Sequence, residues 1–126
     1  NYGNHQRDFT YIDDVVEGVI RTLDHIARPS ADWSGEQPDP ATSTAPYRLY
    51  NIGSNNPVKL LRYIEIMEEC IGRKAQKNLL PLQPGDVLNT CADVNALIAD
   101  VNYKPGTPIE TGIARFVKWY RDYYRV

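Results

Sequence analysis

The 126-residue sequence contains few of the residues that build metal and redox sites. Its two cysteines, Cys70 and Cys91, and its two histidines, His5 and His25, are spaced unlike any metal-binding motif. We therefore predict no metal site. Cys70 lies within a predicted helix and is interpreted as a small apolar residue of the core. A low number of cysteines is consistent with a reducing compartment, and we expect the protein to be in the cytoplasm.

An excess of one charge and long hydrophobic runs are also missing. The 14 Lys and Arg against 16 Asp and Glu give a formal net charge of −2, so nothing indicates a surface for nucleic acid or for an anionic membrane. No apolar run is long enough to cross a bilayer, and no signal peptide is recognised. The length is that of one domain. Because the sequence opens on Asn1 and not on methionine, we interpret it as a piece of a longer protein.

The stretch Arg7–Asp14, RDFTYIDD, leads directly into an amphipathic pattern. It predicts a short extended segment over Phe9–Ile12, followed by a helix over about 14–27 whose apolar residues recur at helical spacing. Asp13 is the expected N-cap of that helix, because its carboxylate can accept a hydrogen bond from a free backbone N–H. Pro29 is expected to stop the helix.

The composition changes twice in the middle of the chain. Residues 28–47 are rich in proline, serine, threonine and aspartate, which predicts a long surface loop. The one aromatic residue in the first half of this loop is Trp33, which is expected to attach the loop to the body of the protein. Arg48–Ile52 predicts a strand that ends at Gly53, and we expect the amide of Asn51 to tie the end of this strand to a loop.

Three further helices are predicted after this strand. The first of them is expected to begin after an N-cap at Asn56, with Pro57 in its first position, and to stop at Gly72. The next covers Val94–Asp100, and the last follows a capping box that starts at Thr107. Four helices with a few short strands give a mixed, helix-rich α/β fold class.

Three motifs in this order carry a resemblance to a known family. RDFTYIDDVVEGV, from Arg7, resembles nearly letter for letter a segment of the extended short-chain dehydrogenase/reductases that epimerise, dehydrate or decarboxylate nucleotide sugars. It is most similar to the group of UDP-glucuronate 4-epimerases and capsular-polysaccharide epimerases, and YNIG (50–53) and QPGD (83–86) follow as in that family. The resemblance covers essentially the whole chain. It implies that residues 1–126 are the C-terminal, nucleotide-sugar-binding portion of a Rossmann-type enzyme.

The resemblance also implies roles for three residues. Arg7 contacts the diphosphate of the nucleotide sugar, which suits a planar and permanently charged guanidinium. Asp86 approaches the ribose hydroxyls, since a carboxylate can accept hydrogen bonds from both. Gln83 stands where many relatives have an arginine, although the uronate-epimerase group often shares the glutamine. Gln83 carries no charge, so what else neutralises the phosphates is left open.

Both charged residues have ordinary structural explanations as well. Arg7 is equally explained as a surface cation paired with a neighbouring carboxylate such as Asp8, a pair that contributes little to stability. Asp86 follows Pro84 and Gly85, and this triplet is common in turns where the aspartate bonds to its own backbone.

The catalytic apparatus of the family is missing from the sequence. No glycine-rich turn joins a strand to a helix, and no tyrosine is followed by a lysine four residues later. We therefore assign no catalytic and no cofactor-binding residue to this chain. The resemblance implies that NAD is bound by an N-terminal Rossmann part absent from the chain, and that the fragment alone is inactive and binds no cofactor.

The function that the resemblance implies is anchoring of the UDP moiety in an NAD-dependent nucleotide-sugar 4-epimerase. The sugar would be inverted at carbon 4 through a 4-keto intermediate. Two alternatives stay open: a decarboxylase or dehydratase of the same family, and a non-catalytic interaction or dimerisation module. The expected partners are a UDP-sugar substrate and a second copy in a homodimer, with no nucleic acid and no membrane.

Overall fold

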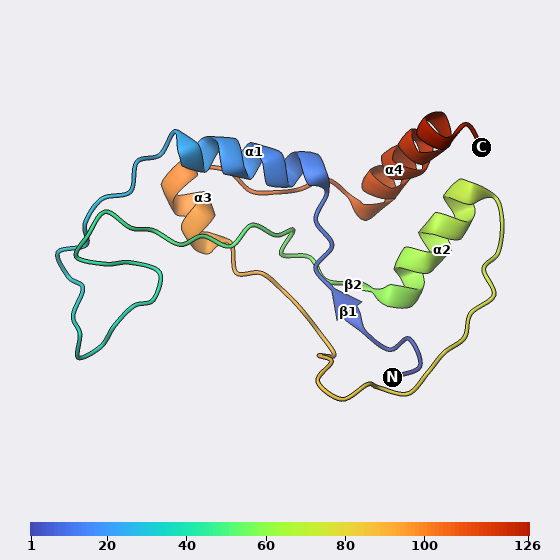
Figure 1. Ribbon diagram of the computed structural model, residues 1–126, viewed down its shortest axis with the longest axis horizontal. Coiled ribbons are helices and arrows are strands. Elements are labelled where there is room, and N and C mark those ends of the chain that lie inside the picture. Colours follow the sequence, from blue (N-terminus) through green and yellow to red (C-terminus); the bar gives the residue numbers. More distant parts are fainter.

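The computed structural model describes residues 1–126, and Figure 1 shows its elements in two groups. Helices α1 and α3 lie together in one half of the molecule, and helices α2 and α4 in the other, with a short two-stranded sheet between them. The elements in chain order are β1 Gln6–Arg7, α1 Ile12–Leu23, β2 Val58–Lys59, α2 Leu60–Ile71, α3 Asn95–Val101 and α4 Ile109–Tyr124. Four helices with short strands confirm the predicted fold class.

The apolar core lies between α2 and α4. Ile66 of α2 packs with Ile113 and Val117 of α4, and all three side chains are buried. Partly buried residues surround this cluster, and Cys70 is one of them, which confirms its interpretation as an apolar packing residue. The ring of Phe9 stacks on Tyr63 of α2 with centroids 4.1 Å apart. This contact attaches the segment after Arg7 to the core.

The half that contains α1 has buried side chains at α3, where Val94 and Leu97 are both 0 % exposed, but it leaves most of the apolar face of α1 uncovered. Gly18 is the buried residue of α1, because Ile52 lies so close that a Cβ at this position would be 3.2 Å from its Cδ1 atom. In contrast, most apolar side chains of the same helix are 44 to 75 % exposed; they are Ile12, Val16, Val19, Ile20 and Leu23, while Val15 is partly buried. Hence α1 is amphipathic, but most of its apolar face is not covered within this chain.

The helix α1 begins two residues earlier and ends four residues earlier than predicted. Its N-cap position is Tyr11 and has no side-chain cap, so the prediction of Asp13 as N-cap is wrong. The helix ends at Leu23 because the N–H of His25 bonds to the carbonyl of Thr22, three residues back, which tightens the last turn.

The predicted caps of two other helices make tertiary contacts instead. The backbone N–H of Asn56 bonds to Asp8 Oδ1 at 3.1 Å, and α2 starts only at Leu60, so the predicted start is wrong. The Thr107 hydroxyl donates to Asp14 Oδ1 at 2.8 Å and does not cap α4. The predicted stop at Gly72 is confirmed, since this residue has the left-handed φ of 77°.

One predicted strand is absent from the structure. Arg48–Ile52 makes only an isolated bridge between Thr42 and Arg48. The segment predicted as extended, Phe9–Ile12, has extended backbone at Tyr11, but its last residue, Ile12, already belongs to α1. A strand needs a neighbour that pairs with it, and the sheet of this chain consists of β1 and β2 alone. The amide of Asn51 does tie its segment to a loop, as predicted, because its Nδ2 donates to the carbonyl of Asp93 at 3.2 Å.

The segment between α1 and β2 contains no helix or strand and extends to the left in Figure 1. Its own atoms hold its turns together: Ser30 N–H bonds to Ser43 O, and the indole of Trp33 donates to the carbonyl of Asp39 at 3.1 Å. That bond stays within the loop and does not pin it to the body as predicted. No helix of the structure is long and apolar enough to span a membrane.

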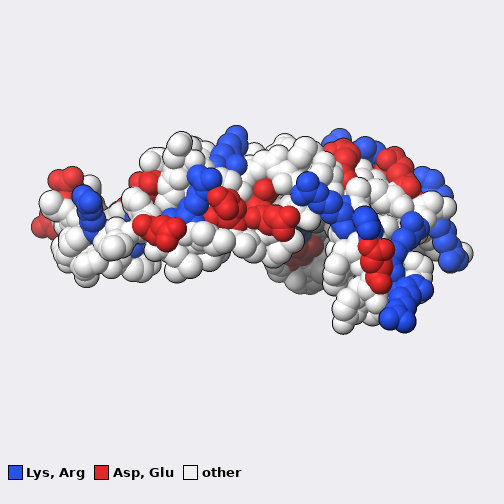
Figure 2. Space-filling model, turned by 90° about the horizontal axis from the view of Figure 1, so that it is seen from above, with Lys and Arg blue, Asp and Glu red and all other residues white.

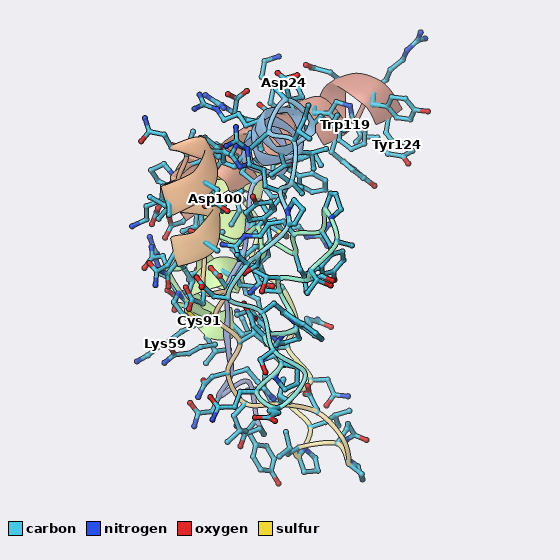
Figure 3. All side chains as sticks on the ribbon, turned by 90° about the vertical axis from the view of Figure 1, so that its left-hand side faces the viewer. Asp24, Lys59, Cys91, Asp100, Trp119 and Tyr124 are labelled. Atoms are coloured by element: carbon cyan, nitrogen blue, oxygen red, sulfur yellow. The ribbon has the colours of Figure 1, made fainter.

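The far end of this segment is fixed to α3 by a charged cluster. Arg48 Nε lies 2.8 Å from Asp100 Oδ2, and the hydroxyl of Tyr50 donates to the same oxygen at 2.9 Å. Burial by itself raises the pKa of Asp100, but the hydrogen bonds from Arg48 and Tyr50 bring this pKa below its ordinary value. Asp100 therefore stays ionised and holds the loop against the helix (Figure 3).

Candidate ligand-binding site

The strand that carries Arg7 is held from both sides. β1 pairs antiparallel with β2, so that Arg7 lies opposite Val58. On its other side, the N–H of Gln6 bonds to Leu88 O at 3.0 Å, and the N–H of Thr90 bonds back to Gln6 O at 3.2 Å. The segment 86–90 therefore runs alongside β1, which brings the Gly-Asp loop next to the arginine.

The side chain of Arg7 points to this loop. Its Nη1 donates to the carbonyls of Gln6 at 3.0 Å and Leu88 at 3.1 Å, and its Nη2 lies 2.9 Å from Asp86 Oδ1. The two bonds to backbone carbonyls fix the plane of the guanidinium, and the ion pair uses the other nitrogen. Both charged side chains remain partly exposed. Arg7 and Asp86, which are 79 positions apart, are thus brought together.

Asp86 also has the features of a turn residue. Its N–H bonds to the carbonyl of Gln83 at 3.2 Å, its Oδ1 accepts the N–H of Val87 at 2.9 Å, and Gly85 before it has a φ of 83°. The turn and the ion pair coexist, because one carboxylate oxygen can accept both donors.

Gln83 does not join this pair. Its Nε2 donates to the carbonyl of Pro81 at 3.1 Å, and the residue is exposed. The third charged or polar side chain at the site is instead His5, whose Nε2 lies 3.1 Å from Asp86 Oδ2. Sequence reasoning missed His5 as a site residue. The signal available was its position two residues before Arg7, which places both side chains on one side of an extended strand.

The alternative pairing of Arg7 with Asp8 does not occur. The Asp8 carboxylate accepts three backbone N–H groups, from Asn55 at 3.1 Å, Asn56 at 3.1 Å and Ala92 at 2.9 Å. A Cβ on Gly53 would lie 2.8 Å from Asp8 Oδ2 and 2.4 Å from Ala92 Cβ, so only glycine fits there. The RDF and YNIG motifs therefore meet at Asp8, which holds Arg7 in place.

An apolar cavity of about 230 Å³ opens elsewhere, between the segment 9–12 and α4. It is lined mainly by hydrophobic side chains, among them Phe9, Tyr63, Ile113 and Phe116. None of Arg7, Gln83 and Asp86 lines it. The cavity and the charged side chains at β1 are therefore two separate parts of the molecule.

Comparison with known proteins places these motifs in context. No family model matches the chain. CapI of Staphylococcus aureus is 49 % identical over 125 residues, a match that covers 99 % of this chain and 37 % of CapI. UDP-glucuronate 4-epimerase 5 of Arabidopsis thaliana is 40 % identical over 123 residues, which are 97 % of this chain and 27 % of the plant protein.

The chain is homologous to the C-terminal part of the UDP-glucuronate 4-epimerases and CapI. It spans only about a third of the length of these relatives.

Solved structures show the same fold. The UDP-glucuronic acid 4-epimerase of Bacillus cereus in complex with NAD superposes with a TM-score of 0.71 at 23 % identity, over 99 % of this chain and 32 % of that one. Its Y149F mutant, in complex with UDP-4-deoxy-4-fluoro-glucuronic acid and NAD, gives a TM-score of 0.73 at 25 % identity over 97 % and 34 %. The described residues thus adopt the fold of this region in a Rossmann-type epimerase.

Proposed function

We propose that this chain is the substrate-binding part of an NAD-dependent nucleotide-sugar 4-epimerase. Arg7 holds the diphosphate of the UDP-sugar and Asp86 the ribose hydroxyls, while the sugar beyond the diphosphate stays free to turn. The observation that carries this proposal is the convergence of Arg7 and Asp86, from two distant motifs, at 2.9 Å. Relatives and structural neighbours with UDP-glucuronate epimerase names support the choice of substrate.

Anchoring of the nucleotide contributes to catalysis indirectly. Binding energy from a part of the substrate that does not react can fix the position of the reacting carbon. A guanidinium whose orientation is set by the carbonyls of Gln6 and Leu88 is suited to this, because little side-chain freedom is lost when the phosphate binds. The inversion at carbon 4 through a 4-keto intermediate belongs to the proposed reaction of the whole enzyme.

The residues of this chain do not fit NAD. Dinucleotide binding needs a glycine-rich turn between a strand and a helix, whereas β2 runs from Lys59 directly into α2 at Leu60 without a glycine. We therefore assign NAD to the N-terminal part of the full-length protein, and we expect the isolated chain to be catalytically inactive. The same N-terminal part is proposed to cover the exposed apolar face of α1.

The direct test is Arg7→Ala in the full-length protein. Loss of a hydrogen bond to a charged group costs about 1.5–3 kcal/mol, so the affinity for UDP should fall roughly 10- to 150-fold. Isothermal titration with UDP measures it. Arg28→Ala is the matched control, since Arg28 is exposed and outside the proposed site. Unchanged affinity in Arg7→Ala would return this arginine to a purely structural role.

A further inference from the structure

The site contains a buried polar atom that the proposed roles of Arg7 and Asp86 leave unexplained. The side chain of His5 is only 12 % exposed, and its Nε2 lies 3.1 Å from Asp86 Oδ2. The direction of approach does not meet hydrogen-bond geometry, so this nitrogen has no hydrogen-bond partner in the structure. A buried polar nitrogen without a hydrogen-bond partner is uncommon and calls for a functional explanation.

His5 and Arg7 face the same carboxylate from neighbouring positions. They are two residues apart along extended backbone, so their side chains lie on one side. Arg7 Nη2 donates to one oxygen of Asp86 at 2.9 Å, and His5 Nε2 lies 3.1 Å from the other. The two oxygens of a carboxylate are spaced much like two oxygens of a phosphate. Asp86 therefore sits where a phosphate group would be held by the same two side chains.

Arg7 has capacity for more than this carboxylate. Its Nη1 is used by the carbonyls of Gln6 and Leu88, and its Nη2 donates to Asp86, while its Nε–H has no acceptor in the structure. A diphosphate has oxygens enough for the free donors of Arg7 and for His5 together, and guanidinium–phosphate pairs are commonly bidentate.

We propose that His5 and Arg7 together form the diphosphate clamp, and that Asp86 occupies this clamp until the nucleotide displaces it toward the ribose. The inference rests on the proposed function. His5 then supplies the second donor that the uncharged Gln83 does not. Asp86 has two alternating partners: the clamp in the free protein, and the ribose hydroxyls in the complex. In the free protein Arg7 is paired with Asp86, and in the complex the nucleotide binds both residues.

The experiment separates phosphate from ribose by the choice of ligand. Inorganic pyrophosphate, uridine and UDP are titrated into the full-length protein and into His5→Leu, His5→Gln and Asp86→Ala. His25→Leu is the matched control, since His25 is exposed and lies at the far end of α1. Melting temperatures are recorded for every variant, so that affinities are compared between folded proteins only.

We expect His5→Leu to weaken pyrophosphate and UDP roughly 5- to 10-fold and to leave uridine unchanged, with partial recovery in His5→Gln, whose amide can still donate. Asp86→Ala should bind pyrophosphate more tightly than wild type, because the internal competitor is gone, and uridine more weakly. Pyrophosphate binding that is unchanged in both His5→Leu and Asp86→Ala overturns the clamp. If wild type binds no UDP at all, the proposed function fails. That result is distinct from UDP affinity that is the same in wild type and His5→Leu, which contradicts only the clamp.

Discussion

Helices α1 and α2 are both twelve residues long and both amphipathic, yet they bury different amounts of their apolar faces. Ile66 of α2 is 2 % exposed against α4, whereas five of the six large apolar side chains of α1 are at least 44 % exposed, all except Val15. The periodic pattern in each sequence shows which face of a helix is meant to be buried. It does not show what buries it. In α2 the partner is another helix of the same chain, whereas the contacts of α1 with α3 and Ile52 leave most of its apolar face open.

The two helices are expected to differ most in their effect on self-association of the chain. An uncovered apolar face of this kind favours self-association of the isolated chain, so we expect a dimer or a larger species at micromolar concentration. The double variant Ile20→Glu with Leu23→Glu, both on the exposed face of α1, should be monomeric. Light scattering after size exclusion measures the mass.

Ala99→Glu with Ala114→Glu is the matched control, because both alanines are exposed outside α1. If the wild-type chain is a monomer and binds no hydrophobic dye, the prediction that the face of α1 causes self-association is wrong. Arg48–Ile52, predicted as a strand, does not form one, so this segment offers no unpaired strand edge as a second reason for association.

A second difference is expected in stability. Ile66→Ala in α2 should lower the free energy of unfolding by about 2–5 kcal/mol, because it leaves a cavity between α2 and α4. Ile20→Ala in α1 should change it by no more than about 0.5 kcal/mol, since this side chain is half exposed. Urea unfolding followed by circular dichroism compares the two variants. Equal losses would mean that the face of α1 is buried in the isolated chain as well.

The smallest difference concerns one glutamate in each helix and its dependence on pH. Glu68 of α2 is 4 % exposed, and Lys77, Lys74 and the N–H of Ala75 lower its pKa from 4.5 to about 2. Its contribution to stability is therefore fully present above pH 4.5 and is lost as the pH falls toward 2. Glu68→Gln should lack this part of the loss of stability at low pH, because its amide does not titrate.

Glu17→Gln in α1 is the matched control. Glu17 pairs with Arg21 at 2.6 Å, but both side chains are well exposed, and such pairs contribute little. Urea unfolding at a series of pH values from 6 downward gives the curves. The prediction is wrong if wild type and Glu68→Gln lose stability in parallel over this range.

The sequence predicted the end of α2 correctly but not its start, for a physical reason. Gly72 and Asn102 end their helices in the left-handed conformation, which depends on the residue itself. Asn56 and Thr107 have the right chemistry for N-caps, but Asp8 and Asp14 take their hydrogen bonds across the fold. Contacts between distant segments compete with local capping, and local sequence does not reveal them.

The candidate site was predicted in part. The motifs containing Arg7 and Asp86 indicated both residues, and the structure brings these two together; their roles toward a ligand stay predictions. Gln83 was predicted from the same motif but lies apart from them. His5 belongs to no motif, and only the extended path of the chain shows that it faces the same carboxylate.

Aromatic side chains near the C-terminus form a second exposed set. Trp119 and Tyr124 lie at the edge of the molecule in Figure 3, and the ring of Trp119 stacks on Tyr123 with centroids 5.5 Å apart. Around α4 the charges of both signs are mixed, and Figure 2 shows basic side chains at the same end of the molecule. The buried residues of α4 are Ile113 and Val117.

The three backbone bonds to Asp8 have a consequence for the order in which the molecule forms. Its carboxylate accepts hydrogen bonds from the backbone of Asn55 and Ala92, which lie 47 and 84 positions further along the chain. Closing such long segments costs conformational entropy before any contact compensates it, and contacts of high sequence separation form slowly. We therefore expect Arg7, next to Asp8, to reach its final orientation late in folding. On the ribosome, a nascent chain that has not yet exposed Ala92 has the RDF motif but no fixed place for its arginine.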